Sequence, residues 1–226
     1  MNALDISVAD HERISAAVRA AEATTDGEIV TVIAPRSDSY HDVGLHYAIA
    51  AMLILVALVA GYPGWFTSLA THFFGGWQHH LPAPILLTLL LGAQIIVFLI
   101  VRYALAWMPL RMALTPAATK ERRVRRQAIT LFRAAAEART ARQTAILLYL
   151  SEAEKRAEII TDAEINARVA PERWGEAMAV LVDAVHEGNA PDGMIRAIGM
   201  IGTILTGQLP KSADNPNELP DRLIEL

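Results

Sequence analysis

A long stretch without a charged side chain constrains this sequence more than any other feature. From Val43 to Val101, 59 consecutive residues contain no Asp, Glu, Lys or Arg. The stretch is interrupted at residues 61–64 (Gly-Tyr-Pro-Gly) and again at residues 81–84 (Leu-Pro-Ala-Pro). Charged side chains are costly in the hydrocarbon centre of a bilayer, and a spanning helix needs about 20 apolar residues. The sequence therefore predicts a hairpin of two transmembrane helices, over about residues 46–66 and 83–107.

The residues near the ends of the predicted spans indicate the orientation of the hairpin. Trp65, Trp77 and Trp107 lie where aromatic rings are enriched, at the two membrane interfaces. The turn between the spans contains no Lys or Arg, whereas basic residues follow the second span from Arg102 onwards. By the positive-inside rule, both termini are expected in the cytoplasm and the turn outside.

Outside the uncharged stretch the composition is that of a globular domain. The whole chain is 53% hydrophobic, with a mean hydropathy of +0.30, and the roughly 160 residues outside the stretch suffice for one domain with its own core. The chain has no cysteine, which excludes disulfides and thiolate metal sites. Met1–Asp10 has no basic segment followed by an apolar one, so no cleavable signal peptide is expected.

Both flanks of the uncharged stretch are expected to contribute to one α/β domain. Before the stretch, a helix begins near Asp10, its expected N-cap, and a β-branched strand covers Glu28–Ala34. After it, the pattern predicts an amphipathic helix, an antiparallel strand hairpin and two further helices, over residues 117–139, 144–150 with 156–161, 171–186 and 192–205. Because an isolated strand is not stable, the first strand must join the later two.

These elements give four predicted parts. Residues 1–42 hold the first helix and strand, 43–110 the transmembrane hairpin, 111–210 the remainder of the α/β domain and 211–226 a flexible tail. The two parts of the domain must lie on one side of the membrane, and a hairpin of two spans satisfies that requirement.

The order of the elements resembles the TPM domain family, named for thylakoid lumen, photosystem-repair and acetylcholine-receptor-modulator members. The matching residues are Asp26-Gly27-Glu28-Ile29-Val30 at the first strand, then Trp174, Gly188, Gly193 and Leu209-Pro210. The sequence is most similar to the bacterial membrane branch, in which a hairpin is inserted in the domain. This resemblance implies a small α/β sandwich in a bacterial inner membrane and a role in assembly or repair of membrane complexes. Some plant members are described as acid phosphatases.

Three acidic residues are candidate ligands for a divalent cation, the one cofactor that the sequence suggests. Asp38, Asp162 and Glu164 offer the oxygen ligands that such ions prefer. The alternative is that all three are solvated surface acids. Where the family commonly has an Asp-x-Gly-Ile-like turn after the third strand, this sequence has Glu164 in place of the Gly, which removes the backbone freedom of glycine.

A basic run follows the second predicted span and is a candidate lipid-binding surface. It contains Lys120, Arg122, Arg123, Arg125 and Arg126. A basic residue near an anionic leaflet contributes on the order of 1 kcal/mol to membrane binding. The alternative is an orientation signal on a solvated helix face. Nucleic-acid binding is disfavoured, because no aromatic residues are interleaved with the run.

The sequence supports two functional hypotheses of different classes. In the first, the domain is a docking or assembly module held at the membrane surface, with a protein partner or a second copy of the chain. In the second, which comes from the family resemblance, the protein is a metal-assisted phosphatase that uses Asp162 and neighbouring acids. No phosphate-binding loop, cysteine nucleophile or Asp-x-Asp motif supports the enzyme. A small transporter is disfavoured, since two spans offer little polar lining.

Overall fold

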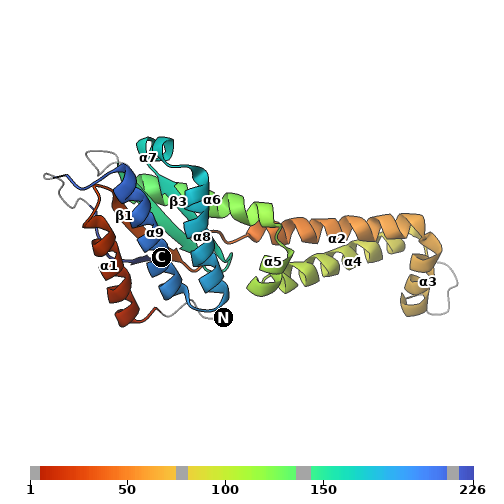
Figure 1. The fold of residues 1–226 in the computed structure, drawn as a ribbon. Coiled ribbons are helices and arrows are strands. Elements are labelled where there is room, and N and C mark those ends of the chain that lie inside the picture. The colour runs from red at the N-terminus through yellow and green to blue at the C-terminus, as the bar shows by residue number, and fades with distance from the viewer. Residues whose placement is uncertain (1–5, 75–80, 136–143, 213–218) are drawn as a thin grey trace. The chain divides into compact units, whose positions relative to one another are not determined.

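The chain folds into two compact units (Figure 1). The computed structural model describes residues 6–74, 81–135, 144–212 and 219–226. The α/β unit consists of Met1–Asp38 and Ala117–Leu226, and the hairpin unit consists of Ser39–Pro116. The corresponding boundaries predicted from the sequence are at residues 43 and 110.

A four-stranded sheet with the order β3-β2-β1-β4 forms the centre of the α/β unit. β1 (Glu28–Ala34) pairs in parallel with β2 (Ala145–Ser151), and β2 pairs antiparallel with β3 (Arg156–Thr161). The expectation that the first strand joins the later two is therefore confirmed, as is the antiparallel hairpin. Every residue of β1 and β2 is buried, which explains why both strands read as continuous apolar or β-branched runs.

Helices cover both faces of the sheet and give the unit two hydrophobic cores (Figure 1). Alternate β1 residues point to opposite faces, because the side-chain period of a strand is two. Ile29 and Ile33 join the core formed with α1, α8 and α9, whereas Val30 and Val32 join the core formed with α6. These helices span Val8–Glu22 (α1), Ala117–Ala135 (α6), Pro171–His186 (α8) and Ala190–Gln208 (α9). A short helix that the sequence pattern did not predict, α7 (Ala163–Arg168), follows β3.

Glycines allow α9 to approach its neighbours closely. A Cβ atom built on Gly193 would lie 2.5 Å from the Ala184 Cβ of α8, and one on Gly202 would lie 2.7 Å from the Ala21 Cβ of α1. Real Cβ atoms do not come so close, so a larger residue at either position would force the helices apart. The packing of α9 between α1 and α8 therefore depends on these two positions.

Two sequence-based expectations for the chain ends are wrong. The N-cap of α1 is Ser7, whose Oγ accepts a hydrogen bond from the Asp10 amide at 3.1 Å; Asp10 lies in the first turn instead. The tail predicted over 211–226 is folded where the structure describes its end. Leu219 and Leu223 are buried there, and β4 (Ile224–Glu225) pairs in parallel with β1. A strand of two residues has too little pattern to be recognised in a sequence.

In its described residues, 39–74 and 81–116, the hairpin unit contains two long helices and two short ones. α2 (His41–Gly61) packs against α4 (Ala83–Ala104); α3 (Pro63–Phe74) follows α2, and α5 (Met108–Leu114) follows α4. Where a span was predicted over 46–66, the helix begins and ends about five residues earlier; where a span was predicted over 83–107, the helix begins as predicted and ends at residue 104. The first ends at Gly61 because Pro63 lacks an amide hydrogen and starts a new helix.

A buried arginine lies at the open end of the hairpin, the end at which α2 begins and α4 ends. The Arg111 guanidinium of α5 is 3% exposed and donates from Nε to the Leu105 carbonyl at 2.7 Å and from Nη1 to the Ser39 carbonyl at 2.6 Å. Burial of a charge is costly unless hydrogen bonds satisfy it. These two bonds engage part of the guanidinium and link the chain segment before α2 to the segment after α4.

Candidate functional site

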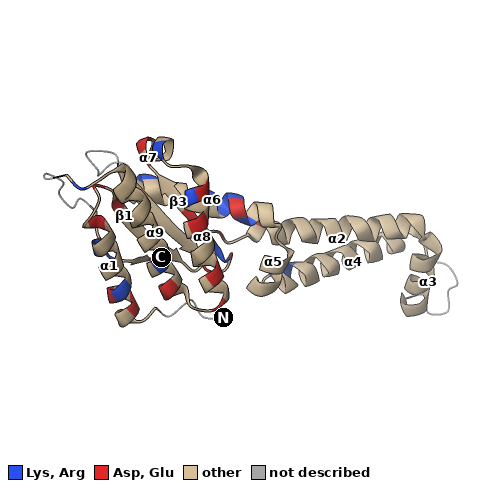
Figure 2. Ribbon diagram, viewed as in Figure 1, with Lys and Arg blue, Asp and Glu red and all other residues tan. Residues whose placement is uncertain are grey.

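The hairpin unit exposes an extended apolar surface. Within the described residues, α4 has no buried side chain, and α2 buries only Val43, Gly44 and Ala48. Leu53 on α2 and Leu87 on α4 are each 65% exposed. Figure 2 shows the lack of charge along these helices, where Asp42 and Arg102, near the open end, are the only Asp, Glu, Lys or Arg.

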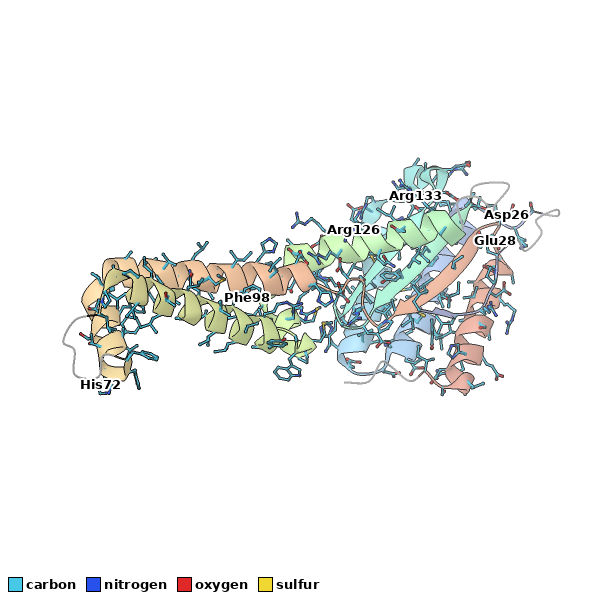
Figure 3. All side chains as sticks on the ribbon, turned by 180° about the vertical axis from the view of Figure 1, so that it is seen from behind. Asp26, Glu28, His72, Phe98, Arg126 and Arg133 are labelled. Carbon is cyan, nitrogen blue, oxygen red and sulfur yellow. The ribbon has the colours of Figure 1, made fainter. Side chains whose placement is uncertain are left out.

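Exposed aromatic side chains lie at both ends of this apolar surface. Tyr103 and Trp107 lie at the open end, where the Tyr47 hydroxyl donates to the Leu114 carbonyl at 3.0 Å. Tyr62 and Trp65 lie at the opposite end, at the α2–α3 junction. Of the three tryptophans predicted at span ends, Trp77 is outside the described residues. His72 of α3 and Phe98 of α4 mark the two helices in Figure 3.

The α/β unit carries a second feature, a set of buried acids at the start of β1. Glu22, Asp26 and Glu28 are each less than 10% exposed, and Figure 3 labels Asp26 and Glu28. Each of these side chains accepts a hydrogen bond from a backbone amide. Asp26 Oδ1 accepts from the Ser212 amide at 2.8 Å, and Glu28 Oε2 accepts from the Leu219 amide at 3.3 Å. The acids thereby hold the segment after α9 against the start of the sheet.

The fold strongly perturbs the pKa of Glu22. Its Oε1 accepts from the Ile29 amide at 2.8 Å at the start of β1. Burial, together with the nearby carboxylates of Glu28 and Asp221, raises the pKa of Glu22 to about 8, against the lowering effect of the Ile29 hydrogen bond and Lys211. The folded protein therefore holds Glu22 mainly protonated at neutral pH. Sequence reasoning missed this group, because nothing in the local pattern of α1 distinguishes a buried glutamate from an exposed one.

The three predicted metal ligands lie at two different ends of the sheet. Asp162 is buried beside the start of β2, where its Oδ2 accepts from the Ala145 amide at 2.8 Å. Glu164 is exposed on α7 and pairs with Arg168. Asp38 follows the far end of β1. Because a strand of seven residues is on the order of 20 Å long, Asp38 and Asp162 are separated by about the length of the sheet. The structure does not bring the three together, and the described part of the chain contains no group of three potential protein ligands for a metal.

Ion pairs within the α/β unit engage much of the predicted lipid-binding run on α6. Arg123 and Arg126 lie 3.2 Å and 2.9 Å from the Asp38 carboxylate, and Arg125 lies 3.6 Å from Glu158. Burial raises the pKa of Glu158, against the lowering effect of Arg125. Arg122 is exposed and donates to the Ala118 carbonyl of its own helix at 3.3 Å. Figures 2 and 3 show α6 with its basic residues, of which Arg126 and Arg133 are labelled. Lys120 forms no ion pair within the described residues.

A third polar feature lies at the far end of β1 and β2, around the β2–β3 turn. Glu154 is buried in this turn and accepts hydrogen bonds from the Ser37 amide at 3.0 Å and from the Ser151 hydroxyl. The Ser37 hydroxyl also contacts the Tyr149 hydroxyl at 2.9 Å, and burial raises the pKa of Tyr149. This network joins the segment after β1 to the β2–β3 turn. Neither Glu154 nor the turn was singled out from the sequence as a site.

Comparison with known proteins identifies the fold but no function. No protein-family model matches the chain, and no curated protein matches it. Among solved structures, the chain is similar to the BA42 protein from the psychrophilic bacterium Bizionia argentinensis, solved by NMR. The match covers 100% of both chains with a TM-score of 0.57 and 16% sequence identity. At this identity the likeness concerns the fold, so the chain has a mixed α/β fold like that of BA42.

Proposed function

We propose that this protein is an integral membrane protein in which α2 and α4 span the bilayer as a hairpin. The observation that carries the proposal is that both helices are long, apolar on all sides and largely exposed. Their 21 and 22 residues correspond to about 32 Å of helix, close to the roughly 30 Å of a bilayer core. A core helix of a soluble protein would instead be mostly buried, and monomeric soluble proteins rarely expose apolar patches larger than a few hundred Å².

The distribution of charge supports an orientation with the α/β unit in the cytoplasm. Arg102 lies in the last turn of α4, Arg111 follows on α5 and α6 adds further basic residues, whereas the described residues between α2 and α4 contain no Lys or Arg. Basic residues are retained on the cytoplasmic side of bacterial inner membranes. We therefore place both termini in the cytoplasm.

In this proposal the α/β unit is a TPM-like docking or assembly module that the hairpin holds at the membrane surface. The BA42-like fold supports the α/β sandwich that the family resemblance implies. The resemblance also suggests a role in assembly or maintenance of membrane complexes. The expected partner is a protein of such a complex or a second copy of this chain. Extraction tests the membrane part: the full chain should stay in the membrane pellet in alkaline carbonate and be released by detergent. Recovery in the carbonate supernatant would contradict it.

One observation favours the alternative, a metal-assisted phosphatase. Glu28 and Ala145 are register partners, and Asp162 binds the Ala145 amide, so Glu28 and Asp162 flank the same end of the sheet. Such acids offer oxygen ligands to a divalent cation. The test is hydrolysis of p-nitrophenyl phosphate by the purified full chain with Mg²⁺ or Mn²⁺. Turnover that Asp162→Asn abolishes would favour the enzyme over the docking module.

A further inference from the structure

A hollow of about 540 Å³ lies in the α/β unit where the start of α6, the β2–β3 turn and the end of α8 meet. Four basic side chains line it: Lys120, Lys155, Arg156 and His186. They come from three separate elements, so the fold gathers them although they are far apart in the sequence. Lys155, Arg156 and His186 lie outside the basic run that the sequence analysis identified.

The positive charge of this hollow is only partly neutralised from within the protein. Lys120 and Lys155 have no acidic partner among the described residues. Arg156 lies 3.7 Å from Glu121, whose side chain is 61% exposed. The acid in the wall, Glu154, is buried and accepts the Ser37 amide hydrogen bond. The available groups are therefore ammonium and guanidinium donors, which suit the oxygens of a phosphate group.

The β2–β3 turn that presents two of these residues is rigidly built. Its Glu152 and Ala153 amides donate to the Ala34 and Pro35 carbonyls, each at 3.0 Å. Lys155 has a positive φ of 48°, uncommon for a residue other than glycine, and its amide closes the turn on the Glu152 carbonyl at 3.0 Å. The turn is therefore fixed to the segment after β1, and the positions of Lys155 and Arg156 are set before any ligand binds.

Both links between the α/β unit and the hairpin unit start beside this hollow. On one side, Ser37 binds Glu154 of the wall, and Asp38 is the last residue before the hairpin unit. On the other, Lys120 comes four residues after Pro116, the last residue of the hairpin unit. Four residues span at most about 14 Å even when extended. If α2 and α4 span the bilayer, these short links limit how far the hollow can lie from the adjoining leaflet.

We propose that this hollow binds the phosphate headgroup of an anionic phospholipid. The proposal rests on the proposed membrane insertion for the source of the ligand and on the four basic side chains for its chemistry. A soluble phosphate ester offers the same chemistry, but it would not explain why the hollow lies beside both links. Bound in this way, a lipid would hold the α/β unit close to the membrane surface through a defined site rather than through the whole basic face of α6.

The test counts lipids retained by the full chain in native mass spectrometry from a non-ionic detergent. Phosphatidylglycerol and phosphatidylcholine are the probes, and glycerol 3-phosphate is the soluble competitor. The site variant is Lys120→Gln with Lys155→Asn, because Asn tolerates a positive φ. The matched control is Arg173→Gln with Arg196→Gln, which removes the same charge from exposed positions that lie outside both the hollow and the basic run of α6. Circular dichroism confirms that both variants are folded.

We expect the wild type and the control to retain phosphatidylglycerol in preference to phosphatidylcholine, and the site variant to bind phosphatidylglycerol at least about tenfold more weakly. Equal losses in the site variant and the control would overturn the proposal in favour of diffuse surface charge. Displacement of the lipid by equimolar glycerol 3-phosphate would assign the hollow to a soluble ester. Carbonate extraction of the same proteins keeps the two proposals apart, since a chain can be integral to the membrane and still lack the headgroup site.

Discussion

Replacement of Glu22 by Gln should stabilise the protein at neutral pH, although it changes a buried, hydrogen-bonded residue. The Gln side chain keeps the Oε1 acceptor for the Ile29 amide, and it never ionises. The side chain of Glu22 has a pKa of about 8 in the folded protein, whereas an unperturbed glutamate, as in the unfolded chain, has a pKa of 4.5. Between these two pH values the unfolded chain releases the Glu22 proton while the folded chain keeps it.

The sign and size of the effect follow from this difference. The unfolded state binds fewer protons than the folded state, so stability falls as pH rises, by about 1.4 kcal/mol per pH unit. The stability that Glu22 contributes to the folded state is fully present below pH 4.5 and is lost progressively as the pH rises to 8. At pH 7 the loss amounts to about 3 kcal/mol. Glu22→Gln should therefore be more stable than the wild type by about 3 kcal/mol at pH 7 and by under about 1 kcal/mol at pH 5.

Tryptophan fluorescence can follow this unfolding, because Trp174 is the only tryptophan outside the hairpin unit. Trp65, Trp77 and Trp107 are replaced by Phe in every protein, and the full chain is unfolded by urea in detergent at several pH values. Exposed Glu12 of the same helix, replaced by Gln, controls for the loss of a negative charge on α1. An advantage of Glu22→Gln that is absent at pH 7, or that does not shrink from pH 8 to pH 5, would refute the reasoning.

Two further predictions use the same assay. Gly193→Ala should lower the free energy of unfolding by about 1–3 kcal/mol through overpacking, because the new Cβ would lie 2.5 Å from that of Ala184. The control is Gly199→Ala, where nothing lies within 4 Å, and it should be neutral or stabilising by up to about 1 kcal/mol. Equal effects at the two positions would contradict the packing argument. Ser7→Ala should lower the free energy of unfolding by about 1 kcal/mol, because it removes the side-chain acceptor for the Asp10 amide. Ser7→Thr keeps a hydroxyl acceptor and should retain most of that stability. Equal losses in the two variants would argue against the N-cap.

The parts of the fold that were predicted correctly have strong local signals. β1 ends where expected, since Pro35 follows it, and α8 begins with Pro171 and ends just before Gly188, which has a positive φ of 80°. The long helices α2 and α4 follow from the absence of charge. The missed elements, α3, α5, α7 and β4, are short or continue a run of similar composition, so periodicity does not distinguish them.

The candidate sites were less predictable, because they depend on tertiary contacts. Asp38 and Asp162 were predicted to share a cation site as oxygen ligands, but one follows the end of β1 and the other lies beside the start of β2. Asp38 is instead engaged by Arg123 and Arg126. The buried state of Glu22 arises from the packing of α1 beside the sheet, and no residue near it in the sequence signals it. A sequence pattern therefore locates strand ends and charged runs but not which of them meet.

Cysteine accessibility in intact cells tests the central claim, a membrane hairpin with a cytoplasmic α/β unit, most directly. The chain has no cysteine, so single thiols at Ser68 of α3 and at Glu187 after α8, both exposed, report without background. A membrane-impermeant maleimide should label residue 68 in intact cells and residue 187 only after permeabilisation. Labelling of residue 187 but not residue 68 in intact cells would contradict the account and place the α/β unit outside the cytoplasm.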